Sequence, residues 1–173
     1  MAKTSPDNYF ENFRVGDVYQ HVRGRTVTNE DNLSITHLTL NTAQPHFNLE
    51  YMQEMMGGEF RERLVMGAVT LAIVVGLTSE DMSENAFVDL GLTGIRLFSP
   101  VYKDDTLYAT SEVLRVGDSH SRPDAGEMAY RFTGRKGDGS LVVEGERQLL
   151  IKRREYWARR DGNEEESADG RRA

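Results

Sequence analysis

The spacing of hydrophobic positions changes character near residue 85 of the chain. Before it, apolar residues recur at helical spacing or in one continuous run, which predicts helices. After it, apolar and polar residues alternate, which predicts strands. This order indicates an α+β fold in which an antiparallel sheet wraps around one long central helix. The expected helices are 28–40, 49–56 and 65–78, and the expected strands are 17–27, 87–100, 105–116, 127–136 and 141–153.

Local motifs set the ends of several of these elements. Thr28 and Asp31 have the spacing of a capping box, which predicts the start of the first helix. Pro45 disfavours the helical region for the residue before it, so we expect residues 41–45 to form a loop. Residues 136–140 read KGDGS, which is typical of a hairpin turn between two strands.

Composition narrows the class of protein. A chain of 173 residues fits one domain, and its net charge of −7 argues against a general nucleic-acid binder, which carries a basic stripe. The absence of cysteine excludes disulfides, thiolate nucleophiles, cysteine-ligated zinc and iron–sulfur clusters. The longest apolar run is shorter than the roughly 20 residues of a membrane span, and we expect it to form a helix buried on all sides. The sequence has no recognisable signal peptide, so we expect a cytoplasmic protein. We also expect no membrane and no nucleic-acid partner.

His46 is the histidine best placed for chemistry. It lies in a short loop between two predicted helices, and loops held by rigid elements are where reactive groups tend to be placed. Its imidazole can accept a proton near pH 7. The alternative is a loop histidine that only hydrogen-bonds to backbone. We expect His21 to be exposed in the first strand, and His37 and His120 to be structural or exposed.

Met66 and Gly67 stand at the start of the long apolar helix. A helix N-terminus presents unpaired N–H groups and a partial positive charge, which suit a developing oxyanion. A glycine there lets a ligand approach the backbone closely. The alternative is that Gly67 serves only helix packing.

Several segments resemble one known family. Asn41 and Thr42, together with residues 121–126 (SRPDAG), are similar to one branch of this family, the mesaconyl-CoA hydratases. They are also similar to relatives that act on branched or dicarboxylic enoyl-CoA thioesters. The likeness covers most of residues 9–152. The segments that resemble this family, the MaoC-like hydratases with the hot-dog fold, are 9–17 (YFENFRVGD), 41–48 (NTAQPHFN), 64–67 (LVMG) and 98–107 (FSPVYKDDTL).

The resemblance implies an organisation and a reaction. It implies a single hot-dog domain over residues 9–156. The composition of the flanking segments predicts a flexible arm (1–8) and a disordered charged tail (157–173), since the tail mixes charges, Gly and Ser without a period. The implied reaction is the reversible addition of water across the double bond of a short, branched enoyl-CoA thioester, of the mesaconyl or itaconyl type. Coenzyme A is then part of the substrate, and we expect no further cofactor and no metal. Family members of this length form homodimers, or dimers of dimers, with the acyl-CoA site at the interface.

The resemblance also implies roles for individual residues. His46 occupies the position of the general acid and base, and Gly67 occupies the oxyanion position. The aspartate that the family usually carries five residues before this histidine is replaced by Asn41. Because an amide cannot take a proton, our hypothesis is that Asn41 orients the water through its carbonyl oxygen. Met66 replaces the histidine that usually precedes the helix glycine.

Two arginines are candidates for binding the substrate, together with Met66. Arg122 lies in the branch-specific motif, and its planar guanidinium suits the free carboxylate of the substrate or the phosphates of coenzyme A. The alternative is a salt bridge between Arg122 and Asp124. Arg63, just before the central helix, is a second candidate for the phosphates.

Two other functions stay open at this point. One is an acyl-CoA thioesterase on the same fold, since a fold does not fix its chemistry. Hydrolysis usually needs a carboxylate near the central helix, and residues 65–78 contain none, which favours hydration. The other is a non-catalytic acyl-CoA-binding protein.

Overall fold

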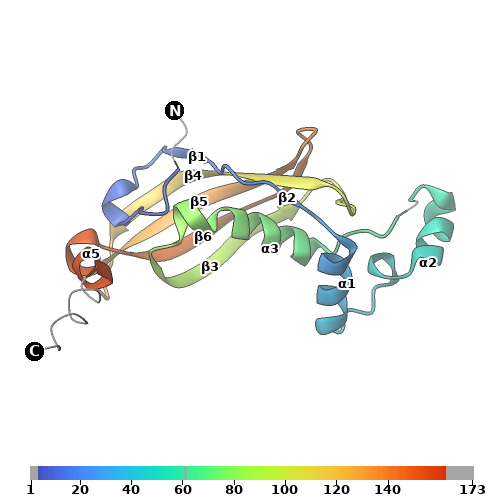
Figure 1. Cartoon of the computed structure of the whole chain (residues 1–173), viewed down its shortest axis with the longest axis horizontal. Helices are drawn as coiled ribbons and strands as arrows, with labels where there is room; N and C mark the ends of the chain where they lie inside the picture. Colours follow the sequence, from blue (N-terminus) through green and yellow to red (C-terminus); the bar gives the residue numbers. More distant parts are fainter. Residues whose placement is uncertain (1–3, 61, 163–173) are drawn as a thin grey trace, which may run out of the picture.

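The apolar run that begins at Gly67 forms the helix at the centre of the molecule. In the computed structural model, which describes residues 4–60 and 62–162, helix α3 (Gly67–Leu77) lies along one face of a curved sheet (Figure 1). The strand order is β1-β4-β5-β6-β3, β2 also pairs with β4, and every pair is antiparallel. The predicted α+β architecture is therefore confirmed. The strands are β1 (Val18–Gln20), β2 (Arg25–Thr26), β3 (Ala86–Leu97), β4 (Thr106–Asp118), β5 (Ala125–Lys136) and β6 (Leu141–Lys152).

The alternation that predicts the long strands also sets which face each residue takes. Along β4, Leu107, Ala109, Ser111 and Val113 are buried, and the residues between them are more exposed. This is the pattern of an antiparallel sheet with one face on the core and one on solvent. All four long strands lie within three residues of their predicted bounds.

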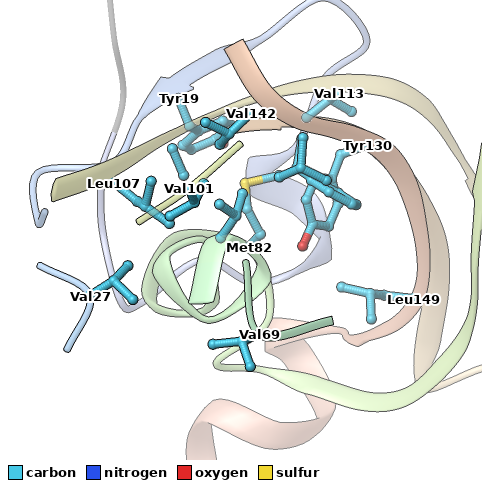
Figure 2. Packing of buried hydrophobic residues seen from close by; sticks show 14 of the residues in the cluster. Tyr19, Val27, Val69, Met82, Val101, Leu107, Val113, Tyr130, Val142 and Leu149 are labelled. Atoms are coloured by element: carbon cyan, nitrogen blue, oxygen red, sulfur yellow. The ribbon is translucent and has the colours of Figure 1, made fainter. Parts of the chain in front are cut away.

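The core fills the space between α3 and the sheet. Figure 2 shows Met82, Tyr130 and Leu149 among the side chains that meet there, and all three are almost fully buried. The helix comes close to the sheet at Gly134, where an added Cβ would lie 2.5 Å from the Val74 side chain. A glycine is therefore required at that position of β5.

Two further helices lie beyond one end of the sheet (Figure 1). The predicted capping box is present in the first of them: the Asp31 N–H donates to the Thr28 hydroxyl (3.2 Å), and the Thr28 N–H donates to the Asp31 carboxylate (2.8 Å). Pro45 lies in a 3-10 turn and not in an open loop, because proline is tolerated in the first positions of a helical turn. The helical elements other than α3 and α5 are η1 (Phe10–Asn12), α1 (Asn29–Leu38), η2 (Gln44–His46), α2 (Leu49–Glu54), η3 (Met55–Gly58) and α4 (Ser79–Met82).

The first predicted strand is interrupted. Residues 21–24 lie opposite only Tyr108 and Ala109 of β4, because Gln20 pairs with Thr110 and Arg25 with Leu107. The extra residues bulge out of the ladder, which separates β1 from β2.

The side chain of His21, just before the bulge, points inward like that of Tyr19, while Gln20 between them is exposed. His21 is 6% exposed and contacts Asp81 through Nδ1, while its Nε2 lies 2.8 Å from the Ser111 hydroxyl. The prediction that His21 is exposed is wrong, because Asp81 and Ser111 supply hydrogen-bond partners for both ring nitrogens in the interior.

The C-terminal segment begins as a helix. In α5 (Arg154–Gly162) the Trp157 ring packs edge-on against Phe87, with 4.7 Å between centroids, and its Nε1–H donates to Asp124 (3.2 Å). The prediction that the disordered tail starts at residue 157 is wrong for residues 157–162, since these contacts fix the helix to the end of the sheet. Residues 163–173 lie outside the described part of the chain.

The described part of the predicted flexible arm is held against α4. The Ser5 N–H donates to the Asp81 carboxylate (2.7 Å), and the Asn8 amide donates to the Asp81 carbonyl oxygen (3.0 Å). Residues 4–8 therefore differ from the expectation of a free arm, while residues 1–3 lie outside the described range.

One side of the molecule exposes apolar surface. Ala68, Ala72 and Gly76 of α3 are exposed in the single chain, so the prediction of a helix buried on all sides is wrong for this chain alone. None of the helices in residues 4–60 and 62–162 combines the length and hydrophobicity needed to cross a membrane. The edge strand β3 and the residue after it add further exposed side chains: Val88, Leu90, Leu92, Ile95, Leu97 and Phe98.

Candidate active site

The 3-10 turn η2 places His46 against the segment that leads into α3. His46 Nδ1 lies 2.9 Å from the carbonyl oxygen of Leu64. A carbonyl oxygen can only accept, so Nδ1 carries the proton and donates it. The neutral ring then has a lone pair on Nε2, which hydrogen-bonds to no residue in the described part of the chain. This tautomer can take a proton from a water molecule at Nε2.

The amino end of α3 supplies the second chemical feature. Gly67 is the first residue of the helix and Met66 is its N-cap. The first N–H groups of a helix have no carbonyl partner within it, and they carry part of the positive end of the helix dipole. The segment before the helix is held in place because the Val65 N–H donates to the Val101 carbonyl oxygen (2.9 Å). A Cβ at position 67 would overlap the Leu97 side chain, so only glycine fits without movement.

His46 and Gly67 line the same pocket, which has a volume of about 300 Å³. Thr70 and Ser99 are the other polar side chains in its wall, which contains no Asp or Glu among residues 4–60 and 62–162. The pocket can therefore hold a small apolar group with its reactive atoms near His46 and the start of α3. Apolar residues in the wall include Phe60, Leu64, Val65, Leu97, Phe98 and Val142.

Asn41 lies beside the N-cap of α3. Its Nδ2 donates to the sulfur of Met66 (3.0 Å), and its Oδ1 accepts the N–H of Ala43 (2.8 Å). Met66 is 8% exposed. The structure thus brings Asn41 and Met66 together next to Gly67, with one lone pair of the Asn41 carbonyl oxygen engaged in the turn that leads to His46.

Arg63 lies beside this pocket. Its Nε–H donates to the Phe47 carbonyl oxygen at 2.9 Å. Together with Lys103 and Glu62 it lines a second hollow, of about 360 Å³. The two hollows are adjacent, because residues 64 and 101 line the first and residues 63 and 103 line the second.

The structure does not bring Arg122 near this pocket. Arg122 forms two hydrogen bonds with Asp124 (2.9 and 2.8 Å), and its guanidinium stacks on Phe87 at 4.2 Å. The same pairing lowers the pKa of the Asp124 carboxyl. Phe87 is near the start of β3 and Leu97 is at its end, so about 30 Å of strand separates Arg122 from the pocket in one chain. The salt bridge with Asp124, which was the alternative for this residue, is present.

Sequence reasoning missed Asn32, which is 3% exposed and contacts three segments of the site. Its side chain bonds to the backbone of His46, Leu64 and Met66. Periodicity identifies apolar positions on the buried face of a helix and ignores a polar residue there. The spacing of four between Asn32 and the equally buried Thr36 could have indicated the face, but not the partners.

A second polar network lies in the interior, between β1, α4 and β4. Burial lowers the pKa of His21, although the hydrogen bond from its Nδ1 to Asp81 acts in the opposite direction. His21, Asp81 and Ser111 are all buried, so this trio has no route to a substrate. Across residues 4–60 and 62–162, no three His, Asp or Glu side chains are grouped so that they could hold a metal ion.

Comparison with known proteins connects this site to one reaction class. A family model described as mesaconyl-CoA hydratase matches residues 2–173. The chain is similar to the mesaconyl-CoA hydratase of Haloarcula marismortui, with 32% identity over 149 residues, 86% of this chain and 41% of that protein. It is also similar to the beta-methylmalyl-CoA dehydratase of Chloroflexus aurantiacus, with 29% identity over 79% of this chain and 38% of that protein. The chain thus spans about two fifths of the length of the curated relatives it matches.

Solved structures confirm the hot-dog fold. A putative MaoC domain protein dehydratase from Chloroflexus aurantiacus matches with a TM-score of 0.77 and 26% identity, over 86% of this chain and 45% of that chain. A Mycobacterium tuberculosis protein described as a double hotdog fold matches with a TM-score of 0.76 and 17% identity, over 85% of this chain and 44% of that chain. In both cases the likeness covers less than half of the larger protein.

Proposed function

The chain belongs to the mesaconyl-CoA hydratase family, and from that premise we propose that it is a hydro-lyase that adds water reversibly to a short, branched enoyl-CoA thioester. A dicarboxylic acyl group of the mesaconyl type is the proposed substrate, because the relatives that match are named for such thioesters. The observation that carries the proposal is the pocket shared by His46 and the amino end of α3.

His46 is the proposed general base and acid. As the water oxygen bonds to the β-carbon, Nε2 takes one of the water protons, and the electron pair of the double bond moves toward the thioester carbonyl. The imidazolium then returns a proton to the α-carbon, which completes the addition of H–OH. The Leu64 carbonyl supports this role, since it holds the proton of the resting imidazole on Nδ1. General acid–base catalysis of this kind contributes about 10²–10⁴-fold in rate.

The N–H of Gly67 is the proposed donor to the thioester oxygen. That oxygen gains negative charge as the enolate forms, and the positive end of the α3 dipole stabilises it. The lack of a side chain at Gly67 leaves room for the thioester, and the apolar wall strengthens the interaction by excluding water.

Asn41 and Met66 are proposed to shape the site between these two groups. The amide of Asn41 bonds to Ala43 and to the Met66 sulfur, which supports a role in holding the His46 turn. The second lone pair on the Asn41 carbonyl oxygen can still accept a hydrogen bond from the attacking water and so orient it, as hypothesised from the sequence. Met66 is buried and does not line the pocket, so we do not retain it as a residue that contacts the acyl group.

Arg63 is proposed to bind the phosphates of coenzyme A, with Lys103 as a second cation in the same hollow. The hollow adjoins the pocket, so a thioester held at Gly67 would extend toward these cations. Arg122 is engaged with Asp124 and Phe87, so we do not retain it as a phosphate or carboxylate ligand from the same chain.

The proposed assembly is a homodimer, or a dimer of such dimers, in the cytoplasm. The exposed apolar residues of β3 and of the α3 face supply a surface of the kind that mediates protein contacts. A groove of about 450 Å³ between α1 and α3, lined by Ile35, Ala68 and Ala72 among others, belongs to the same side. The relatives that are more than twice as long, one of them described as a double hotdog, support a second hot-dog unit on this surface.

A thioesterase is the second candidate. It is disfavoured because no Asp or Glu of the described part of the chain lines the pocket, so these residues supply no carboxylate nucleophile or base in the wall. A non-catalytic acyl-CoA-binding protein is the third, and the free lone pair of His46 in the pocket favours catalysis over it.

One assay separates the three candidates. The chain is mixed with linear, methyl-branched and carboxylated enoyl-CoAs, and the loss of absorbance at the enoyl-thioester band is followed together with the release of free thiol. Because the chain has no cysteine, any thiol detected comes from coenzyme A. A loss of absorbance without thiol release, fastest for the branched and carboxylated thioesters, is the expected result. Thiol release would indicate a thioesterase, and saturable binding with neither signal would indicate a binding protein.

A further inference from the structure

Asn32 is a buried amide at the junction of three segments that build the site. It lies in the first turn of α1, whose start is fixed by the capping box. Its Nδ2 donates to the carbonyl oxygen of His46 at 2.8 Å and to that of Leu64 at 3.3 Å. Its Oδ1 accepts the N–H of Met66 at 2.9 Å. Both ends of the amide are therefore used, and all of their partners are backbone groups.

These partners are the groups on which the proposed reaction depends. The Leu64 carbonyl oxygen accepts from Asn32 and also from His46 Nδ1, so the same oxygen joins the amide to the imidazole. The N–H of Met66 comes directly before that of Gly67, so its bond to Asn32 fixes the peptide that begins α3. One side chain on α1 thus connects the base to the oxyanion donor.

We infer that Asn32 is a positioning residue, which holds the Nε2 lone pair of His46 and the N–H of Gly67 in a fixed mutual orientation. Asn32 does not itself line the pocket and acts through the His46, Leu64 and Met66 peptides. The inference rests on the proposed function for its effect on turnover, but its effect on the imidazole can be measured without any substrate.

The physical consequence of losing the amide follows from these contacts. Without Asn32, the Leu64 peptide can rotate and the Nδ1 proton loses its fixed acceptor. The neutral imidazole then exchanges between its two tautomers, and the one with the proton on Nε2 cannot take a proton from water. A displacement of about 1 Å in such a site costs about 10²-fold in rate.

A matched control lies one turn further along the same helix face. Thr36 is fully buried, and its hydroxyl is the buried side-chain polar atom that lacks a hydrogen-bond partner in the described part of the chain. The Thr36→Val substitution removes a buried polar group from the same face of α1 without breaking a bond to the site. It separates a general effect on α1 from the specific effect of Asn32.

The test compares Asn32→Leu with the wild-type chain and with Thr36→Val. We expect Asn32→Leu to lower kcat on the order of 10²-fold while KM changes less than about threefold. In ¹⁵N NMR spectra of the imidazole, the wild-type His46 should be the Nδ1–H tautomer, and the variant should be a mixture of both. Thr36→Val should match the wild type in kcat and in tautomer.

A second variant keeps the test decisive where Asn32→Leu folds poorly. Asn32→Asp retains the oxygen that accepts from Met66 and loses both donors, so it should also shift the tautomer of His46. The inference is wrong if a folded variant keeps both kcat and the wild-type tautomer. It is also wrong if kcat falls with the tautomer unchanged, or if neither variant folds while Thr36→Val does, since Asn32 would then be purely structural. A wild-type chain without hydratase activity would overturn the proposed function, and the NMR result would still decide the role of Asn32.

Discussion

At the scale of single residues, backbone groups hold the candidate site together. The Leu64 carbonyl fixes the tautomer of His46, and none of the carboxylates that the structure describes lines the pocket around it. The imidazole is therefore oriented by a neutral backbone carbonyl and not by a carboxylate. An imidazole of this kind can serve as base in one direction of a reversible addition and as acid in the other.

The buried His21 makes stability depend on pH. Burial lowers its pKa below the ordinary value of 6.5, so in mildly acidic solution the unfolded chain binds a proton that the folded chain does not. The free energy of unfolding should therefore rise with pH through the window below about 6.5, and reach its plateau above it. Urea midpoints at pH 5 and pH 7.5 measure this difference, and we expect a lower midpoint at pH 5.

His21→Gln should reduce the difference between the two midpoints, and His120→Gln, at an exposed histidine, should leave it unchanged. A wild-type midpoint that is higher at pH 5 would contradict the account. It would mean that the folded state stabilises a charged His21 beside Asp81.

Residue-level reasoning from the sequence finds some of these groups and not others. His46 and Gly67 can be found because a loop histidine and a helix-start glycine have chemical meaning by themselves. The burial of His21 depends on Asp81 and Ser111, and the role of Asn32 depends on carbonyls at residues 46 and 64. No local pattern predicts these partners. Such contacts arise only when distant segments are brought together.

At the scale of elements, α5 is attached to the end of the sheet opposite the site (Figure 1). Trp157 packs on Phe87 and donates to Asp124, and Arg122 stacks on the same Phe87 ring. An aromatic ring with these contacts contributes to stability through its buried area and through its polar N–H.

Trp157→Ala should lower the free energy of unfolding by about 1–3 kcal/mol, because the ring is half-buried and full burial in a core is worth more. It should leave kcat within about twofold, since the site lies at the other end of the sheet. Urea denaturation and the hydratase assay measure the two quantities. Tyr156→Ala, at the exposed neighbour, is the control and should have a small effect on both. An unchanged stability would show that α5 is not fixed by these contacts.

The prediction of helices and strands succeeds where a periodic pattern extends over many residues. It fails where a segment is held by contacts with residues distant in the sequence. The four long strands repeat with period two over many residues, so their positions follow from the sequence. Residues 157–162 have no apolar period, and α5 is held by the contacts of Trp157 with Phe87 and Asp124, which no local pattern predicts. The hot-dog fold itself is not contained in the pattern, and its prediction depended on the resemblance of residues 41–48 and 64–67 to a known family.

At the scale of the whole molecule, we expect the exposed apolar surface of β3 and α3 to be buried against a second copy of the chain. We expect the wild-type chain to be a dimer in sedimentation-velocity experiments. Leu92→Glu, in the middle of β3, should produce a monomer, because it buries a charge in the proposed interface. The value of kcat/KM should fall with the dimer if the site is completed by the second copy.

Val22→Glu is the control for this change, since Val22 is 72% exposed and lies beside the opposite edge of the sheet. It should remain dimeric and active. A Leu92→Glu chain that sediments as the wild type does would place the interface elsewhere.

The net charge of −7 affects how the whole molecule would bind its proposed substrate. A chain that is acidic overall is proposed to bind coenzyme A, a polyanion, so positive charge must be concentrated near the pocket. Arg63 and Lys103 line the adjoining hollow, whereas Arg122 lies at the far end. Sequence alone could not separate these arginines, because their positions relative to the pocket depend on the length and curvature of β3.

The central claim is that His46 carries the proton in a hydration reaction, and the rate for His46→Gln tests it most directly. Glutamine keeps the size and a hydrogen-bonding amide but cannot act as a base near pH 7. With a branched enoyl-CoA, kcat should fall about 10²–10⁴-fold relative to the wild type, while His120→Gln retains the wild-type rate. A His46→Gln chain that still hydrates the thioester at near the wild-type rate would contradict the account.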